Sequence, residues 1–132
     1  MSAKPHFLEP LLKANAAPHV LLNERAGAVV AHDLELAGDS RTRTRGLLGR
    51  SGIGTGEAMI IAPCNAVHTF FMRFTIDVVF ADRSGRVVKL CRRLRPWRIG
   101  IGPRGFAAVE LEAGSIDAGG IAAGDRLVIA QK

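Results

Sequence analysis

The sequence predicts a mainly β domain, a small β-sandwich or partly open barrel with one short basic helix near residues 40–49. Three observations carry this prediction. The apolar runs are short, of the length typical of strands. Glycine-rich and proline-rich turns separate them. One turn signal, over residues 82–85, joins two such runs as a hairpin. Short strands joined by turns at this spacing are typical of sandwiches and barrels.

The N-terminal half is expected to form a hairpin and then the helix. Residues 19–23 form a short apolar run, and residues 28–36 alternate imperfectly after an intervening turn, which is hairpin-like. Asp39 or Ser40 can serve as the N-cap of the helix, because short polar side chains accept hydrogen bonds from the first free N–H groups. The basic helix is expected over residues 41–48.

The C-terminal half is expected to supply most of the sheet. Residues 70–81 are the most apolar stretch of the chain, and their second half, 76–81, predicts a buried strand. Loops are expected at 52–56 and 96–105, which are rich in glycine. The remaining expected strands are 58–62, 86–94, 107–111 and 126–130, with a turn-rich connector at 116–123.

Length and composition fit one globular domain. The 132 residues are 48% hydrophobic and 23% charged, which are ordinary values. Residues 1–18 hold three prolines and no clear periodicity, so we expect a loosely ordered arm before a single domain over 19–132. No apolar run suits a signal peptide or a membrane span. Two cysteines, Cys64 and Cys91, fit a reducing compartment, so we expect a cytoplasmic protein; a single bridge between them stays open.

The net charge of +6 is concentrated in the middle of the chain, where residues 41–104 hold 13 basic and three acidic residues. Such a segment attracts anions. Arginine side chains around an aromatic ring suit a phosphate or another anionic ligand, although basic strands also protect sheet edges from aggregation. The anion-binding candidates are Arg92, Arg93, Arg95, Trp97 and Arg98.

His68, Arg73 and Asp77 lie on one apolar segment. On a continuous strand Arg73 and Asp77 would share a face. The three could then orient a ligand or act in acid–base catalysis. Alternatively, Asp77 and Arg73 form a structural ion pair that holds the strand and its turn.

Glu110 interrupts the apolar run 106–111, where a carboxylate is costly without a partner. Arg45, Arg50 and Arg73 are natural partners. A catalytic carboxylate and an edge-strand residue facing water both explain its position. The catalytic candidates are therefore His68, Asp77 and Glu110. The ligand-binding candidates are Arg45, Arg50, His68, Arg73 and Asp77.

A metal site is not expected. Cys64 and His68 are four residues apart, but zinc would need two further ligands, and the sequence holds no second paired motif. The sequence likewise indicates no cofactor, because the phosphate-binding loops that hold nucleotides are not recognisable in their proper context.

Several motifs resemble the bacterial and archaeal family called domain of unknown function 192, over about residues 21–128. They are RGLLGR at 45–50, MII at 59–61, FMRFTIDVVF at 71–80, GRV at 85–87, Pro96, VEL at 109–111 and GD at 124–125. Cys64, Val67 and His68 before Met72 are similar to one branch of that family. Another branch has Lys and Asn where this chain has Arg73 and Phe74. The resemblance implies a compact β-sandwich or barrel with a short helix, and it implies no activity.

We therefore favour a non-enzymatic binding or accessory module with a basic, anion-attracting face. Its partner is unknown, and an anionic ligand or a protein would fit. A small hydrolase that uses Asp77 or Glu110 with His68 is one alternative, and the sequence supplies no nucleophile motif for it. A weak nucleic-acid binder is the other, and none of the usual binding modules is present to favour it.

Overall fold

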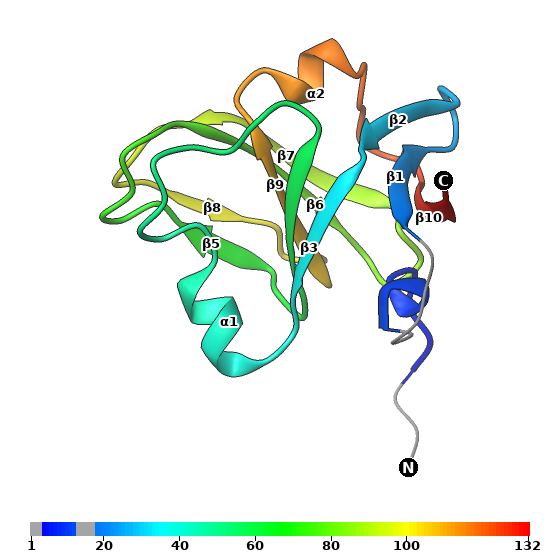
Figure 1. Cartoon of the computed structure of the whole chain (residues 1–132), viewed down its shortest axis with the longest axis horizontal. Coiled ribbons are helices and arrows are strands. Elements are labelled where there is room, and N and C mark those ends of the chain that lie inside the picture. Colours follow the sequence, from blue (N-terminus) through cyan, green and yellow to red (C-terminus); the bar gives the residue numbers. More distant parts are fainter. Residues whose placement is uncertain (1–3, 13–17) are drawn as a thin grey trace.

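The computed structural model describes residues 4–12 and 18–132, and within the first helix the side chains of 40, 44 and 45 lie outside that description. The described part holds ten strands, two short helices and a 3-10 turn (Figure 1). In chain order they are η1 (Glu9–Leu12), β1 (His19–Asn23), β2 (Ala28–Ala31), β3 (Asp33–Ala37), α1 (Ser40–Arg45), β4 (Glu57–Ile61), β5 (Ala66–His68), β6 (Ile76–Ala81), β7 (Val87–Leu94), β8 (Ile99–Ile101), β9 (Ala107–Glu112), α2 (Ser115–Ala118) and β10 (Leu127–Gln131). The expected mainly β architecture is confirmed.

A central five-stranded sheet organises the domain. Its strand order is β3-β4-β9-β6-β7, in which only β3 and β4 run parallel. One of its faces packs against the three-stranded sheet β10-β1-β2, and the other lies against α1 and the small sheet β5-β8 (Figure 1). The central sheet is therefore covered on both faces.

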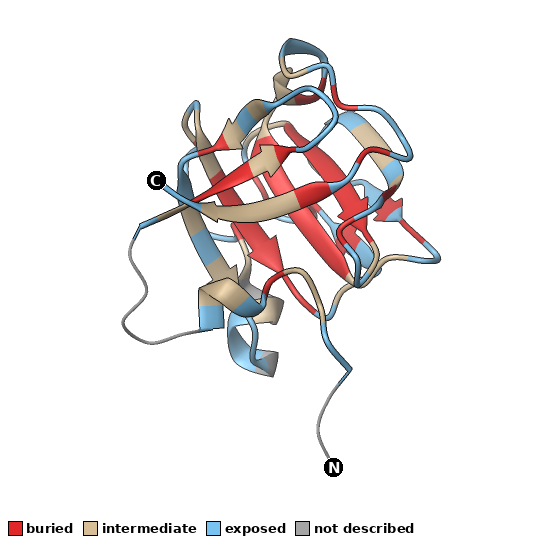
Figure 2. Cartoon of the chain, turned by 90° about the vertical axis from the view of Figure 1, so that its right-hand side faces the viewer, coloured by how far each residue is buried: buried red, intermediate tan, exposed pale blue. Residues whose placement is uncertain are grey.

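Burial on both faces explains why two strands are almost wholly apolar in sequence. All six residues of β6 and five of the six in β9 are buried (Figure 2). Strands covered on both sides carry continuous rather than alternating apolar residues. Along β9, Val109 and Leu111 face β1 and β10, whereas Ala108 faces the side of α1. Glu110 shares that second side, because alternate residues of a strand point to one face.

Helix α1 begins where the sequence indicates. The Asp39 side chain accepts the Thr42 N–H at 2.8 Å, and the Thr42 hydroxyl lies 3.3 Å from the Asp39 N–H, which together form a capping box. The helix ends at Gly46, whose φ of +46° favours glycine. The chain then turns inward, and Leu47 is 2% exposed in the core against the central sheet.

Two expected segments differ in the structure. Residues 28–36 are not one strand but β2 and β3, which belong to different sheets, because the chain crosses between layers at His32. The expected loop 96–105 contains β8, which pairs with β5. The expected buried strand 76–81 is confirmed as β6, and a turn with Phe71 at a φ of +67° separates it from β5.

The described part of the N-terminal arm, residues 4–12, is docked more firmly than expected. Leu8 is 1% exposed within the core cluster, and the Phe7 N–H donates to the Arg83 carbonyl at 2.8 Å. Residues 1–3 and 13–17 lie outside the described part, and the expected boundary at residue 18 stays a prediction.

A buried carboxylate joins the last turn of the chain to the first strand. Asp125 accepts hydrogen bonds from the Asn23 side chain and from the Ala122 N–H, both at 2.9 Å, and it forms an ion pair with Arg25. These bonds hold the pKa of the Asp125 carboxyl well below its usual range, with the Arg25 hydrogen bond the largest cause. The Asp125 carboxylate thus stabilises the sheet β10-β1-β2 together with the backbone hydrogen bonds between its strands.

We expect Asp125→Asn to destabilise the domain in a pH-dependent way. A carboxyl whose pKa is lowered on folding contributes stability above its unfolded pKa of about 3.9, and this contribution is lost as pH falls below that value. Urea unfolding of the wild type and of Asp125→Asn should show a difference in free energy of unfolding near neutral pH. This difference should become smaller below about pH 4. A difference of constant size across this range would contradict the role given to Asp125.

Candidate functional site

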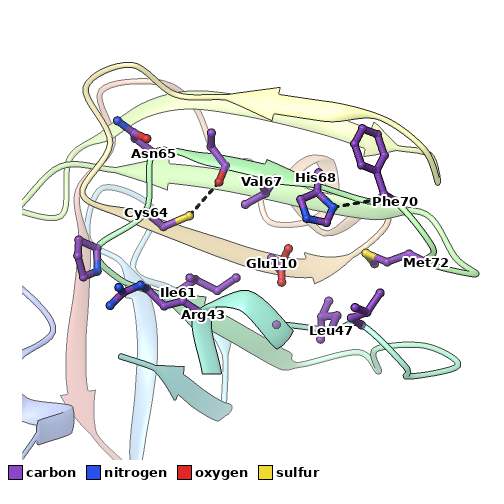
Figure 3. Close-up of a pocket in the computed structure, with 14 residues that line it drawn as sticks. Arg43, Leu47, Ile61, Cys64, Asn65, Val67, His68, Phe70, Met72 and Glu110 are labelled. Atoms are coloured by element: carbon purple, nitrogen blue, oxygen red, sulfur yellow. Dashed lines mark hydrogen bonds between the residues drawn. The ribbon is translucent and has the colours of Figure 1, made fainter. Parts of the chain in front are cut away.

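A pocket of about 370 Å³ lies between the central sheet, α1 and β5 (Figure 3). In Figure 3 Glu110 projects from β9 between the chain segment of Cys64 and His68 and the segment of Leu47. The floor and walls combine apolar side chains with a few polar groups. The lining residues that matter for its chemistry are Leu47, Cys64, His68, Phe70, Met72 and Glu110.

Glu110 occupies the centre of the central sheet. Its strand β9 lies between β4 and β6, where Glu110 is paired with Met59 on one side and Val78 on the other. The residue is 3% exposed. The alternative of an edge-strand residue facing water is therefore wrong, and Glu110 faces the pocket instead.

The Glu110 carboxyl has an oxygen without a protein donor. Within the described part of the chain nothing donates a hydrogen bond to its buried Oε1. Burial raises the pKa of Glu110 to about 7, and the more distant charge of Arg50 only partly opposes the shift. The helix end contributes to this environment, because a Cβ built at Gly46 would lie 3.6 Å from Oε1. At neutral pH the carboxyl is thus divided between its acid and its carboxylate.

The three arginines expected beside Glu110 are arranged differently. Arg50 forms an ion pair with Glu35 at 2.5 Å, and Arg73 is exposed. The Arg45 side chain lies outside the described part. Of the three, Arg50 is thus the one for which the structure gives an electrostatic effect on Glu110, and that effect acts without a hydrogen bond.

Cys64 and His68 bring a thiol and an imidazole to the same pocket. The Cys64 Sγ donates to the Ala66 carbonyl at 3.1 Å, and burial raises the pKa of this thiol. The nearby charge of Glu110 raises it further, so Cys64 is a poor candidate for a thiolate nucleophile. The His68 Nδ1 accepts the Phe70 N–H at 3.3 Å, and the two rings stack 5.0 Å apart (Figure 3). A neutral His68 therefore carries its proton on Nε2.

Asp77 has a different environment from the one expected. It is paired with Leu111 across β6 and β9, one position from the Val78–Glu110 pair, so it points to the opposite face of the sheet from Glu110. Its two oxygens accept the backbone N–H groups of Arg93 at 2.8 Å and Ile116 at 2.9 Å. The expected grouping of His68, Arg73 and Asp77 on one strand is therefore not formed. Asp77 instead joins β7 to the start of α2.

The anion-binding candidates lie on β7 and on the turn that follows it. The Arg92 Nε is paired with Asp117 at 2.8 Å, and the Arg93 backbone is held by Asp77. Arg95, Trp97 and Arg98 are exposed on the turn before β8. An anion-binding role for this group stays a prediction, although the Asp117 carboxylate already neutralises part of the charge of Arg92.

The described residues hold no group of three or more His, Cys, Asp or Glu side chains arranged to bind a metal ion. Sequence reasoning missed the apolar half of the pocket, which comes from Leu47, Phe70 and Met72. These residues are distant in the sequence, and a core residue and a pocket residue look alike there. The carboxylate in an apolar run was the one signal that could find the site.

We expect Asp77→Asn to lower the free energy of unfolding by about 1–3 kcal/mol, because an amide leaves one of the two buried N–H groups without an acceptor. Chemical denaturation measures the change. Asp33→Asn, which changes an exposed carboxylate at the start of β3, is the control. An unchanged stability in Asp77→Asn would remove the structural role.

We expect Glu110→Gln to remove a pH dependence of stability. Because folding raises the pKa of Glu110 from 4.5 to about 7, the folded state holds the proton more tightly and stability falls as pH rises between these values. The wild type should lose about 3 kcal/mol relative to the variant over this interval. Urea unfolding at a series of pH values measures it, with Glu112→Gln as the control on the same strand. Parallel curves for wild type and Glu110→Gln would contradict the shift.

Comparison with known proteins supports the family resemblance. The family model DUF192, described as "Uncharacterized ACR", matches residues 21–129. A UPF0127 protein from Thermococcus sibiricus is 36% identical over 104 residues, in an alignment that covers 74% of this chain and 66% of that protein. The chain thus spans slightly less than two thirds of the length of this relative.

Two solved structures share the fold. A protein from Sinorhizobium meliloti, provisionally described as a transcription regulator, superposes with a TM-score of 0.72 at 21% identity, covering 83% of this chain and 89% of that one. A protein of unknown function from Novosphingobium aromaticivorans gives a TM-score of 0.69 at 22% identity, covering 96% and 92%. At these identities the likeness concerns the fold alone. The match of the family model to residues 21–129, which are most of this chain, shows that the chain belongs to the DUF192 family.

Proposed function

We propose that this domain is a non-enzymatic binding module whose pocket takes a small molecule through a hydrogen bond to Glu110. The ligand would present an N–H or O–H group to the Glu110 Oε1. The observation that supports this is the burial of an oxygen to which no described group of the protein donates. Buried polar atoms almost always have a hydrogen-bond partner, and exceptions require an explanation.

The rest of the pocket fits such a ligand. Its volume of about 370 Å³ lies within the range of small-molecule sites, which are mainly apolar with a few polar groups that orient the ligand. Leu47, Phe70 and Met72 can contact an apolar body. Arg43 lines the pocket too and supplies a cationic group for an accepting or anionic part of the ligand. The ligand class is therefore a small molecule with a donor at one end and an acceptor or anion at the other.

A small hydrolase remains the second candidate, on one specific observation. A carboxyl with a pKa of about 7 has the value that a general base needs at neutral pH. His68 lines the same pocket, but no hydrogen bond joins it to Glu110 among the described contacts. The Cys64 thiol has a raised pKa and so does not supply the nucleophile. Ester hydrolysis that is lost in Glu110→Gln would favour this candidate over the binding module.

Matched probes test the binding proposal. Valeramide carries an amide donor, and methyl butyrate is an ester of similar size without one. We expect valeramide to shift the NMR signal of the Met72 methyl group, and its affinity to rise with pH through about 7 as Glu110 ionises. Glu110→Leu should lower the affinity for valeramide by about tenfold or more, because a hydrogen bond to a charged group contributes about 1.5–3 kcal/mol.

Two further variants separate charge from shape. Glu110→Gln keeps an accepting oxygen, so it should retain some valeramide binding and lose its pH dependence. Glu112→Gln should bind as the wild type does, since Glu112 does not line the pocket. Equal binding of the amide and the ester, or unchanged binding in Glu110→Leu, would contradict the proposal.

A further inference from the structure

Four large apolar side chains project into solvent on the side of the domain formed by β5 and β8. Phe71 is 71% exposed, Trp97 55%, Ile99 59% and Ile101 56%. Ile99 and Ile101 alternate with the buried Gly100, so they share the outer face of β8. We call these four residues the exposed ridge. Clustered apolar exposure of this kind marks an interaction surface, whereas scattered single residues do not.

The ridge is held in place by a buried residue beneath it. Thr69 is fully buried, and its hydroxyl donates to the Arg95 carbonyl at 2.6 Å and accepts the Arg98 N–H at 2.9 Å. Its backbone N–H donates to the Arg98 carbonyl, and its carbonyl accepts the Trp97 N–H. These four hydrogen bonds tie the turn that carries Phe71 to the turn that carries Trp97.

Both aromatic residues of the ridge have an unusual backbone. Phe71 has a φ of +67° and Trp97 a φ of +66°, values that bulky side chains rarely adopt. The two rings meet with centroids 4.7 Å apart. Conformations of this kind persist where the surrounding structure imposes them, and they cluster at functional sites. The two strained residues bring exposed rings together, and the contact between these rings is not buried in the core.

Exposed arginines flank the ridge residues in sequence. They are Arg73, Arg95, Arg98 and Arg104. The two segments that carry the ridge, 66–76 and 95–104, hold no acidic residue. These segments therefore combine exposed apolar side chains with exposed arginines, a composition complementary to an anionic partner that also accepts apolar side chains.

We propose that the exposed ridge docks the domain onto a bilayer surface of anionic phospholipids. The Phe71, Trp97 and isoleucine side chains enter the interfacial layer, where tryptophan is favoured, and the arginines bind lipid phosphates. The helices of the described part are too short to cross a bilayer, so the contact proposed is peripheral. It does not depend on the ligand of the Glu110 pocket.

The apolar residues favour lipid over single-stranded nucleic acid, which also combines phosphate with stacking surfaces. Bases stack on aromatic rings that have free faces. The centroid of the Trp97 ring already lies 5.9 Å from that of the Phe70 ring and 4.7 Å from that of the Phe71 ring. Ile99 and Ile101 offer no stacking surface, whereas aliphatic side chains partition into the acyl boundary.

The chain has one tryptophan, so its fluorescence reports on the ridge directly. The full chain is mixed with vesicles of equimolar phosphatidylcholine and phosphatidylglycerol, or of phosphatidylcholine alone, and with a single-stranded oligothymidylate. We expect the emission of Trp97 to shift to shorter wavelength with anionic vesicles. Cosedimentation should be at least about tenfold stronger than with neutral vesicles, since each arginine near an anionic surface adds attraction, and salt should weaken it.

Paired variants locate the contact. Phe71→Asn with Ile101→Ser removes exposed side chains and relieves the positive φ, so the fold should be kept, and vesicle binding should fall by at least about tenfold. Arg95→Gln with Arg98→Gln should also lower vesicle binding by at least about tenfold. Val29→Ser, at a 56% exposed position on β2, is the apolar control. Arg126→Gln with Lys132→Gln is the charge control. Both controls should bind as the wild type does.

Four results would overturn the proposal. Three of them are no binding to anionic vesicles at low salt, equal binding to neutral vesicles, and vesicle binding that survives both in Phe71→Asn with Ile101→Ser and in Arg95→Gln with Arg98→Gln. The fourth is a ridge that serves another partner. Oligothymidylate binding without vesicle binding would assign the ridge to nucleic acid. A dimer in analytical ultracentrifugation that Phe71→Asn with Ile101→Ser dissociates would assign it to a second copy of the chain.

Discussion

Burial of both faces of strand β9 is the constraint on which the rest of the structure depends. The strand lies between β4 and β6, with the sheet β10-β1-β2 on one side and α1 with β5 on the other. Each polar group on such a strand loses its water and must find another partner. Val109 and Leu111 meet this constraint on one face by packing in the core. Glu110 on the other face cannot, and the pocket forms around it.

The same constraint gives different roles to the two carboxylates buried in the central sheet. Asp77 lies on the neighbouring strand but on the opposite face, where two backbone N–H groups occupy its oxygens. It is a structural residue, as satisfied buried carboxylates usually are. Glu110 has a raised pKa and an oxygen to which no described group donates a hydrogen bond. Two acids of similar burial thus differ because one is supplied with donors by the backbone and the other faces a cavity.

Much of the fold could be predicted from the sequence. The strand 76–81, the following hairpin and the Asp39 cap follow local patterns, because an apolar run, a turn signal and an N-cap residue each act over a few residues. The crossing between sheets at His32 and the pairing of β5 with β8 could not be predicted, since they are decided by contacts distant in the sequence. For the same reason the sequence identified Glu110 as unusual but could not place it at the centre of the sheet.

The pocket and the exposed ridge share a wall. Phe70 lines the pocket, stacks on His68 and contacts Trp97. Thr69, next to it, ties together the turns that carry the ridge. Phe70 therefore lies between the pocket and the ridge.

Glu110 is expected to titrate near neutral pH, because it is buried beside a pocket and no described group donates to its Oε1. The most direct measurement is a carbon-13 NMR titration of its side-chain carboxyl, assigned by comparison with Glu110→Gln. The expected midpoint is about 7. A midpoint near 4.5, the ordinary value for a glutamate, would show that water or a protein group satisfies the carboxylate, and the pocket would lose its polar anchor.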